Sequence, residues 1–471
     1  MSHVNVSPGA EEHYRNLVLG SGEGGKYLAW SRAKGGERTA VVERGLIGGS
    51  CPNIACLPSK NVIHGAKVAS LFGRAGEFGI KTGRFEVSME GVRSRKRRMV
   101  EGLIQLNLAN YEKSGAELIL GEGRMAGPKT LDVTLKDGTT RRLTADRLFL
   151  SVGTHATIPD IPGLAAARPM THVEALELDR TPGHLIVLGG GSVGLESAQA
   201  LRRLGSRVTV LEQGPQLAGR EDDDVGEAIL NLFGDEDIDV LRNANAVRVS
   251  GVSGQGIRVQ FDKDGQERVL EGTDLLIAVG RTPNTKGIGL ESAGVELDAR
   301  GYIKVNERLE TTAPGVWAMG ECAGSPQFTH VAFDDFRVVR DHLDGGNRTT
   351  RDRLIPSCLF TDPELGRVGL NEREAGELGI GYRVAKMPME AVLRTRTLSE
   401  TRGFMKMLVD EHGNRILGFT AFGAGAGELI AVVQTAMLAR LPFQALRDAI
   451  FTHPTMAEGL TGLLSDIEVK P

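Results

Sequence analysis

The chain has 471 residues, a formal net charge of −4 and 25% charged residues. Such a chain can bury several hydrophobic cores, and its balanced charge does not favour nucleic acid or a membrane surface as partner. No apolar stretch follows a basic start at the N-terminus, no run of about 18 apolar residues occurs, and only four cysteines are present, so we expect a cytoplasmic protein without a disulfide framework.

Residues 16–43 predict a nucleotide-binding unit. The apolar strand NLVLGSGEGG runs into Gly20, Gly22 and Gly25 at G-x-G-x-x-G spacing, and a helical stretch and a second strand, TAVVE, follow. Glu43 ends that strand, 23 residues after Gly20. In such units the glycines let the backbone approach a pyrophosphate, the helix N-terminus holds its negative charge, and the terminal carboxylate binds a ribose hydroxyl.

The same pattern recurs at residues 184–212. The stretch HLIVLGGGSVG provides Gly189, Gly191 and Gly194, and RVTVLE ends at Glu212, again 23 residues after the first glycine. A single glycine pattern is weak evidence, but two complete units with matched spacing argue against coincidence. The sequence therefore predicts two dinucleotide sites.

Cys51 and Cys56 follow the first unit in GGSCPNIACLPSK. A zinc site would need further His or Cys ligands, which the neighbouring sequence lacks, and a disulfide closing so short a loop would contribute only about 2 kcal/mol. We therefore expect no resident metal and favour a redox dithiol beside a redox cofactor, with structural and metal roles as the alternatives.

The spacing of the two cysteines also predicts local geometry. Residues i and i+5 of a regular helix lie about 8.6 Å apart at Cα, beyond the roughly 4.4–6.8 Å that a disulfide spans. The segment is therefore expected to be irregular, as Pro52 and Pro58 also indicate. At such a distorted helix start, the helix dipole is expected to favour thiolate over thiol.

These motifs resemble those of the flavin-dependent pyridine nucleotide disulfide oxidoreductases, which include glutathione reductase, dihydrolipoamide dehydrogenase and mercuric reductase. The resemblance covers nearly the whole chain. Beyond the two units and the cysteine segment, it includes AVGRTPN (278–284), TTAPGVWAMGE (311–321), FTDPELGRVGL (360–370) and HPTMAE (453–458), in the family's order.

The resemblance implies an α/β fold with two Rossmann-like dinucleotide-binding domains and a C-terminal α+β dimerisation domain. It implies FAD on the first unit, NADH or NADPH on the second, and a homodimer whose active sites combine both chains. The expected segments are an FAD domain at 1–157, an NAD(P) domain at 158–283, a return to the FAD domain at 284–349 and an interface domain at 350–471.

The resemblance also implies roles for individual residues. Electrons would pass from nicotinamide to flavin and on to a Cys51–Cys56 disulfide, with Cys56 facing the flavin and Cys51 attacking the substrate. His453 of the partner subunit would shuttle protons, oriented by Glu458. Further positions are Lys60 and Glu196 as an ion pair beside the reacting rings, with Lys60 also touching the cofactor, and Gly49, Ser50, Gly153, Gly280, Arg281, Gly320 and Glu321 as cofactor contacts.

Four departures from the family bear on substrate and cofactor. Glu321 stands where the flavin motif normally ends in Asp, so the longer side chain is expected to need a slightly displaced backbone or cofactor. Ser192 replaces the aromatic gate of glutathione reductase and Trp30 its glutathione-binding arginine, which disfavours glutathione disulfide. Mercuric reductase typically has an N-terminal C-x-x-C domain, a C-terminal cysteine pair and an aromatic residue at the place of His453, and the sequence has none of the three.

The choice of nicotinamide nucleotide and of electron acceptor stays open. Glu212 can accept hydrogen bonds from the ribose hydroxyls of NADH and would repel a 2′-phosphate, although Arg220 lies close enough in sequence to offset this. NADH is therefore favoured. The acceptor is expected to be a small or protein-borne disulfide; the alternatives are a mercuric-reductase-like metal or quinone reductase and a dihydrolipoamide dehydrogenase-like subunit of a larger complex. RSRKRR (93–98) is expected to be a solvated helix face.

Overall fold

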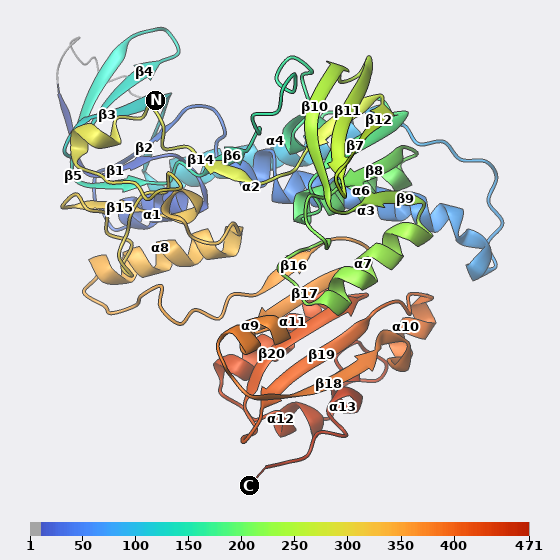
Figure 1. The fold of residues 1–471 in the computed structure, drawn as a ribbon. Helices are drawn as coiled ribbons and strands as arrows, with labels where there is room; N and C mark the ends of the chain where they lie inside the picture. The colour runs from blue at the N-terminus through green and yellow to red at the C-terminus, as the bar shows by residue number, and fades with distance from the viewer. Residues whose placement is uncertain (1–10, 471) are drawn as a thin grey trace. The chain divides into compact units, whose positions relative to one another are not determined.

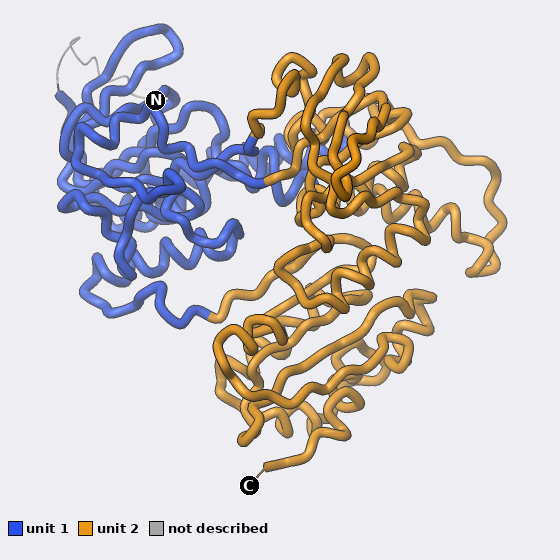
Figure 2. Tube along the Cα trace, in the orientation of Figure 1, with its two compact units in different colours: residues 1–61, 94–157, 280–353 blue, residues 62–93, 158–279, 354–471 orange. Residues whose placement is uncertain are grey.

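The computed structural model describes residues 11–470, which belong to two compact units (Figure 2). Unit 1 combines residues up to 61 with 94–157 and 280–353, and unit 2 combines 62–93 and 158–279 with the residues from 354 onward. The four-part domain division expected from the sequence stays a prediction. No helix within residues 11–470 is both long enough and apolar enough to cross a bilayer.

Unit 1 is built on a six-stranded sheet (Figure 1). Its strands are β1 (Glu12–Leu19), β2 (Thr39–Glu43), β3 (Glu117–Gly127), β4 (Thr130–Leu135), β5 (Thr140–Leu150) and β15 (Val316–Ala318). β1 pairs in parallel with β2 and β5, β2 with β3, and β5 with β15, whereas β4 joins β3 and β5 antiparallel. The apolar runs of β1 and β2 are buried, as expected for parallel strands covered on both faces.

The helices of unit 1 cover this sheet and carry some of the predicted site residues, among them Cys51 and Cys56. They are α1 (Glu23–Lys34), α2 (Ser50–Asn53), the start of α3 (Cys56–Gly73), most of α4 (Met89–Ser114), α8 (Thr329–Leu343), η2 (Leu290–Ala293) and η3 (Gly320–Ala323), and a two-stranded ribbon is formed by β6 (Thr154–Ala156) and β14 (Arg281–Pro283). α1 and α8 pack side by side (Figure 1). A Cβ on Gly24 would lie 3.1 Å from the carbonyl oxygen of Ala332, so the first turns of the two helices adjoin.

The N-terminal part of unit 2 contains the second nucleotide-binding unit. A parallel sheet has the order β13 (Asp274–Ile277), β7 (His184–Leu188), β8 (Arg207–Leu211) and β9 (Ile238–Leu241). The other elements are η1 (Ala75–Phe78), α5 (His172–Ala175), α6 (Ser192–Arg203), α7 (Asp223–Asp235) and the antiparallel sheet of β10 (Ala244–Val252), β11 (Gly256–Lys263) and β12 (Gln266–Gly272). β7, α6 and β8 reproduce the strand, helix and strand predicted from the sequence.

The C-terminal part of unit 2 is an α+β arrangement. Its antiparallel sheet has the order β16 (Ser357–Leu359), β17 (Glu364–Gly369), β20 (Ile416–Gly423), β19 (Phe404–Asp410) and β18 (Tyr382–Pro388). Its helices are α9 (Glu372–Glu377), η4 (Met389–Ala391), α10 (Leu393–Leu398), α11 (Ala426–Leu438), α12 (Gln444–Arg447) and α13 (Gly459–Leu463). All of β20 is buried. The sheets and helices of the two units together confirm the expected fold class.

The basic stretch 93–98 lies in α4, as predicted, but it is not uniformly solvated. Arg95, Arg97 and Arg98 are exposed, whereas Lys96 is buried. Successive residues of a helix point to different faces, so a basic run on one helix has an inward-facing member. The expectation of a solvated face is therefore wrong for Lys96.

Candidate active site

The two glycine loops have the backbone geometry of dinucleotide sites. Gly20 and Gly189 have φ values of 96° and 109°, and a Cβ on Gly20 would lie 2.3 Å from the carbonyl oxygen of Ser151. A Cβ on Gly25 would lie 2.5 Å from the Gly20 oxygen, and one on Gly194 would lie 2.0 Å from the Gly189 oxygen. The backbone conformation and the packing of the protein therefore require glycine at the first and third positions of each loop, with or without a bound nucleotide.

The middle glycine of each loop fits a bound pyrophosphate. Gly22 and Gly191 are the N-caps of α1 and α6, and neither helix start has a side-chain cap. A Cβ on Gly191 would meet no protein atom within 4 Å, so packing does not require a glycine there. Uncapped N–H groups beside an open glycine suit the phosphates of FAD and of a nicotinamide nucleotide.

Glu43 is held by the loops around it. Its buried carboxylate accepts hydrogen bonds from Ser21 N at 2.9 Å and Ser21 Oγ at 2.7 Å, and from the backbone N–H groups of Gly45 and Leu46 at 2.8 and 2.9 Å. These contacts fix the carboxylate at the carboxyl end of β2, where the ribose of a dinucleotide binds in this fold.

Glu212 occupies the equivalent position after β8. Its two oxygens accept hydrogen bonds from the backbone N–H groups of Gly190 and Gly214, each at 2.6 Å. Arg220 is exposed, and its carbonyl oxygen accepts a hydrogen bond from Asn371 Nδ2 at 3.0 Å. The carboxylate is thus fixed beside the glycine loop of the second unit.

The cysteine segment is a broken helix, as its spacing predicted. Cys51 is the second residue of α2, which ends at Asn53, and Cys56 begins α3. Asn53 Nδ2 donates to the carbonyl oxygens of Ile47 and Gly49 at 2.9 and 2.7 Å, which fixes the loop before Cys51. The break brings two thiols together that a continuous helix would keep apart.

Both cysteines are in the reduced state, and their thiols interact. The Cys56 sulfur lies 3.3 Å from Oγ1 of Thr329, in the first turn of α8. The pKa of Cys51 is raised because its thiol hydrogen-bonds to Cys56 and is mostly buried, and because the charge of Glu23 lies nearby. The expectation that this position favours a thiolate is therefore wrong for Cys51.

Glu321 is engaged by two residues of the ribbon β6–β14. Its Oε2 accepts hydrogen bonds from Thr154 Oγ1 and from Arg281 Nε, the latter at 3.1 Å. Arg281 also donates to Thr154 Oγ1 and to the Thr154 carbonyl oxygen at 2.6 and 3.0 Å. Gly153 and Gly280 directly precede these two strands. Four of the predicted cofactor positions are thus neighbours in unit 1.

A buried ion pair holds the loop that carries Gly320. Asp335 of α8 is 0% exposed; its Oδ2 accepts from Gly320 N at 2.7 Å and from Ser325 Oγ at 2.8 Å. Arg353 Nη1 donates to the other oxygen at 2.7 Å. Burial raises the pKa of Asp335, and the pairing with Arg353 opposes that rise. Asp335 therefore links α8 to the predicted flavin loop.

The two predicted partners Lys60 and Glu196 belong to different units. Glu196 is buried on α6, and its Oε1 accepts a hydrogen bond from the backbone N–H of Phe360 at 2.9 Å. Phe360 begins the motif FTDPELGRVGL, so this motif fixes the carboxylate. The pairing of Lys60 with Glu196 stays a prediction.

His453 and Glu458 lie together in the C-terminal part of unit 2. His453 Nδ1 is 2.9 and 3.0 Å from the two carboxylate oxygens of Glu458. The His453 side chain is 60% exposed. The carboxylate can therefore fix Nδ1 of a largely exposed ring. The assigned proton-transfer roles stay predictions.

Trp30 and Ser192, the expected replacements of the glutathione-binding arginine and of the aromatic gate of glutathione reductase, have different surroundings. Trp30 is buried and packs edge-on against Tyr27 and Tyr111, with ring centroids 5.1 and 5.5 Å apart. Ser192 is exposed at the first position of α6. Neither residue offers a positive charge to a substrate carboxylate.

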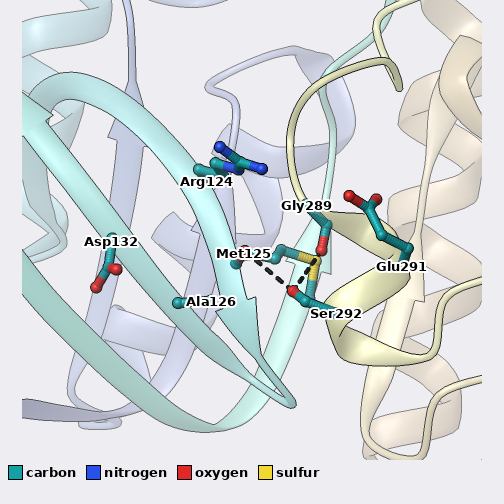
Figure 3. Close-up of a pocket in the computed structure, with 7 residues that line it drawn as sticks. All are labelled: Arg124, Met125, Ala126, Asp132, Gly289, Glu291 and Ser292. Carbon is teal, nitrogen blue, oxygen red and sulfur yellow. Dashed lines mark hydrogen bonds between the residues drawn. The ribbon is translucent and has the colours of Figure 1, made fainter.

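A separate pocket of about 270 Å³ lies between β3, β4 and η2 in unit 1 (Figure 3). Its wall includes Arg124, Asp132 and Glu291, and Ser292 Oγ donates to the carbonyl oxygens of Met125 and Gly289. None of the predicted site residues lines it. Among the described residues, no group of three or more His, Cys, Asp or Glu side chains is arranged to hold a metal ion.

Several residues of the site were missed from the sequence. Thr329, Thr154 and Asp335 contact predicted positions. The two threonines stand far along the chain from their partners, whereas Asp335 stands 15 residues after Gly320. The sequence signal for Asp335 was a charged residue on the apolar face of a helix that ends near Leu343. Thr329 and Thr154 have no local signal.

The chain was compared with known proteins. Residues 14–335 match the family described as pyridine nucleotide-disulphide oxidoreductase, and residues 355–463 match its dimerisation domain. The chain belongs to the pyridine nucleotide-disulphide oxidoreductase family. Its two nucleotide units, cysteine segment and C-terminal domain thus have a common origin with those of characterised enzymes.

Relatives within this family span nearly the whole chain. The chain is 35% identical over 458 residues to the probable pyridine nucleotide-disulfide oxidoreductase RclA of Escherichia coli, covering 96% of this chain and 99% of RclA. It is 34% identical to a mercuric reductase of Streptomyces lividans (96% and 95%) and 31% identical to a dihydrolipoamide dehydrogenase of Chaetomium thermophilum (95% and 90%).

A solved structure shares the fold. The Cu(II) complex of the HOCl-induced flavoprotein disulfide reductase RclA from Escherichia coli has a TM-score of 0.88 and 34% identity, covering 97% of this chain and 100% of that chain. The protein is therefore an NAD(P)H-dependent FAD disulfide reductase, and its dimerisation domain supports a homodimer.

Proposed function

We propose that Cys51 and Cys56 are the redox pair of this reductase and that they reduce a small or protein-borne disulfide. The observation that carries this proposal is the broken helix, which brings the two thiols within hydrogen-bonding distance of each other. The reduced pair would store the two electrons that one disulfide substrate requires.

The exchange balances as two substitutions at sulfur. The Cys51 thiolate attacks one sulfur of the substrate, forms a mixed disulfide and releases the first product thiolate. The Cys56 thiolate then attacks the Cys51 sulfur, which releases the second product thiolate and forms the Cys51–Cys56 disulfide. Two electrons pass from the protein dithiol to the substrate, and each product thiolate takes up one proton.

The first unit would hold FAD, whose chemistry would be hydride acceptance from the nicotinamide nucleotide and two-electron transfer to the sulfur pair. The loop from Gly20 to Gly25, together with Glu43, would hold its pyrophosphate and ribose, and Arg281 with Glu321 would flank its flavin end. The fit rests on the uncapped start of α1 and on the contacts that fix the two carboxylates.

His453 of the partner subunit would move the protons. The contact of its Nδ1 with Glu458 leaves Nε2 available to protonate the leaving thiolate and to accept a proton from Cys51. The raised pKa of Cys51 supports the need for such a base, because the thiol keeps its proton at neutral pH without one.

NADH is the proposed electron donor. Glu212 is fixed by two backbone N–H groups, and its charge would repel the 2′-phosphate of NADPH. The exposed Arg220 is the group that would weaken this preference. The proposed location of the protein is the cytoplasm, where a dithiol can cycle.

A metal ion is the second candidate acceptor. Two solved RclA structures are complexes with Cu(II), and mercuric reductases are among the relatives. Two neighbouring thiols suit a soft metal ion. Lipoamide, which the dihydrolipoamide dehydrogenases suggest, belongs to the disulfide class and is tested with it.

Replacing Cys56 by Ser tests the proposal, and Cys358→Ser is the matched control. Both proteins, loaded with FAD, are reduced anaerobically with NADH, their new thiols are counted, and turnover is measured with lipoamide, a protein disulfide, Cu(II) and a quinone. Wild type and C358S should gain two thiols and reduce disulfides, whereas C56S should gain none and lose disulfide turnover while quinone reduction persists. Disulfide turnover by C56S would refute the relay.

A further inference from the structure

The first turn of α1 carries an ion pair that is largely withdrawn from solvent. Lys26 Nζ lies 2.8 Å from Oε2 of Glu23, and the two side chains are 8% and 17% exposed. The ammonium group also lies over the rings of Tyr27 and Trp30, 5.6 and 6.0 Å from their centroids. A lysine so deeply buried is costly unless a partner compensates its charge, so its position needs a reason.

This turn packs directly against the loop that carries the outer cysteine. Lys26 Nζ lies 3.5 Å from the carbonyl oxygen of Gly48. A Cβ on Gly49 would lie 2.6 Å from Cα of Gly22, the residue before Glu23, so the two loops touch at the backbone. Cys51 follows Gly49 by two residues. The ion pair therefore adjoins the segment in which the predicted nucleophile stands.

We propose that Lys26 and Glu23 form a positioning pair whose opposite charges act on the Cys51 thiol and hold its loop. The proposal deepens the proposed function and rests on Cys51 as the outer nucleophile. Glu23 disfavours ionisation of Cys51, and Lys26, in contact with Glu23, offsets that charge. Removal of either partner leaves the other uncompensated beside the thiol.

Three elements supply the groups that act on Cys51. α3 contributes the Cys56 thiol, α8 the Thr329 hydroxyl and α1 the Glu23 carboxylate. When both thiols are protonated, Glu23 is the charged group among these three. Lys26 is thus placed to modulate the charged neighbour of Cys51 rather than the thiol itself.

Such a device would set the reactivity of a disulfide-exchange thiol. The thiolate is the attacking species, yet intrinsic nucleophilicity falls as the pKa falls, so the fastest thiol has a pKa near the ambient pH. A carboxylate that raises the pKa of Cys51, and an ammonium that offsets the charge of that carboxylate, would set how far this pKa lies above its ordinary value. Unit charges several ångström apart in partly solvated surroundings shift a pKa by about one unit.

The test measures Cys51 directly, without substrate. FAD-loaded protein reduced with dithiothreitol is alkylated with iodoacetamide from pH 6 to 10, and carbamidomethylation of Cys51 is followed by mass spectrometry of the peptide. Lys26→Met should move the pH profile up by about one unit and slow alkylation about tenfold below the midpoint. Glu23→Gln should move it down, and the double variant should return close to wild type.

Two further variants separate charge from structure. Lys26→Arg keeps the charge and should restore most of the wild-type profile. Arg32→Met breaks an ion pair of the same helix, with Asp344 at 2.8 Å, and should leave the profile unchanged. If Lys26→Met does not fold by circular dichroism, Glu23→Gln and the double variant carry the test.

The proposal is overturned if Glu23→Gln leaves the midpoint within about 0.2 units of wild type, or if the two single variants shift it in the same direction. Failure of the proposed function has a different signature, because wild type would then gain no thiols on reduction with NADH. The alkylation profile is measured on chemically reduced protein and does not depend on that result.

Discussion

Replacing Arg353 by methionine is expected to destabilise unit 1 and to loosen the loop that begins at Gly320. Arg353 pairs at 2.7 Å with Asp335, whose side chain is fully buried and accepts from the Gly320 N–H. Methionine fills similar space but leaves the carboxylate without its counter-charge. Removing one partner of a buried pair costs about 3–5 kcal/mol, mostly because the remaining charge has no compensation.

The cost has an upper limit that depends on pH. Asp335 can avoid the cost of a buried charge by taking up a proton. The ordinary pKa of an aspartic acid is about 3.9, so keeping Asp335 protonated in the folded state costs about 1.4 kcal/mol for each pH unit above that value. That limit is about 4 kcal/mol at pH 7 and about 1.5 kcal/mol at pH 5. When the folded-state pKa of a carboxyl is raised, the folded protein is most stable below the unfolded-state pKa of that group and loses stability as pH rises through the folded-state pKa. Burial raises the pKa of Asp335, so the loss of stability caused by the substitution must grow with pH.

Thermal unfolding by circular dichroism and flavin release by fluorescence, both at pH 5 and pH 7, measure this effect. One kcal/mol corresponds to about 2–4 °C for domains of 150–250 residues, so Tm should fall by roughly 10 °C at pH 7 and by under about 5 °C at pH 5. Flavin should be released at lower temperature as well. Arg353→Lys is the control and should lose less. Equal losses at both pH values, or a change below about 1 °C at pH 7, would refute the reasoning.

Three other substitutions test separate parts of the structure. Gly191→Ala should leave Tm unchanged but raise the KM for the nicotinamide nucleotide at least roughly tenfold. Gly194→Ala should lower Tm, because its Cβ would lie 2.0 Å from the Gly189 oxygen. Equal losses of Tm in the two variants would contradict this distinction. Lys406→Met should lower stability by about 3–5 kcal/mol, because Lys406 is 1% exposed and pairs with three carboxylates; a Tm within 1 °C of wild type would argue against it. Glu212→Gln should reduce the NADH to NADPH ratio of kcat/KM by roughly tenfold, and an unchanged ratio would show that Glu212 does not select the nucleotide.

Local sequence was sufficient where glycine and apolar runs define an element. The strand TAVVE is β2 with the same bounds, and HLIVL is β7, because buried parallel strands are continuous apolar runs that end at turns. The helix break between Cys51 and Cys56 followed from spacing and two prolines. The raised pKa of Cys51 was not predictable from the local sequence, because it depends on the neighbouring sulfur, on burial and on a charge on another helix.

Contacts between distant segments were not predictable from local pattern. Thr329 stands 273 residues after Cys56, and Thr154 stands 167 residues before Glu321. Neither threonine has a spacing or periodicity that distinguishes it from other threonines of the chain. Their partners follow from strand pairing and helix packing, which sequence motifs alone do not specify.

Glu321, which stands where the family normally has Asp, makes contacts that the sequence did not predict. The sequence predicts that the extra methylene displaces backbone or cofactor. In the structure that length carries Oε2 to Thr154 and Arg281, while the N–H of Gly320, the preceding residue, is fixed by Asp335. Within the described residues Oε1 accepts no hydrogen bond, so one carboxylate oxygen anchors the loop. Under the proposed function, the other oxygen would accept a hydrogen bond from a ribityl hydroxyl of FAD. A longer acid therefore suits this loop because a threonine across the ribbon binds it.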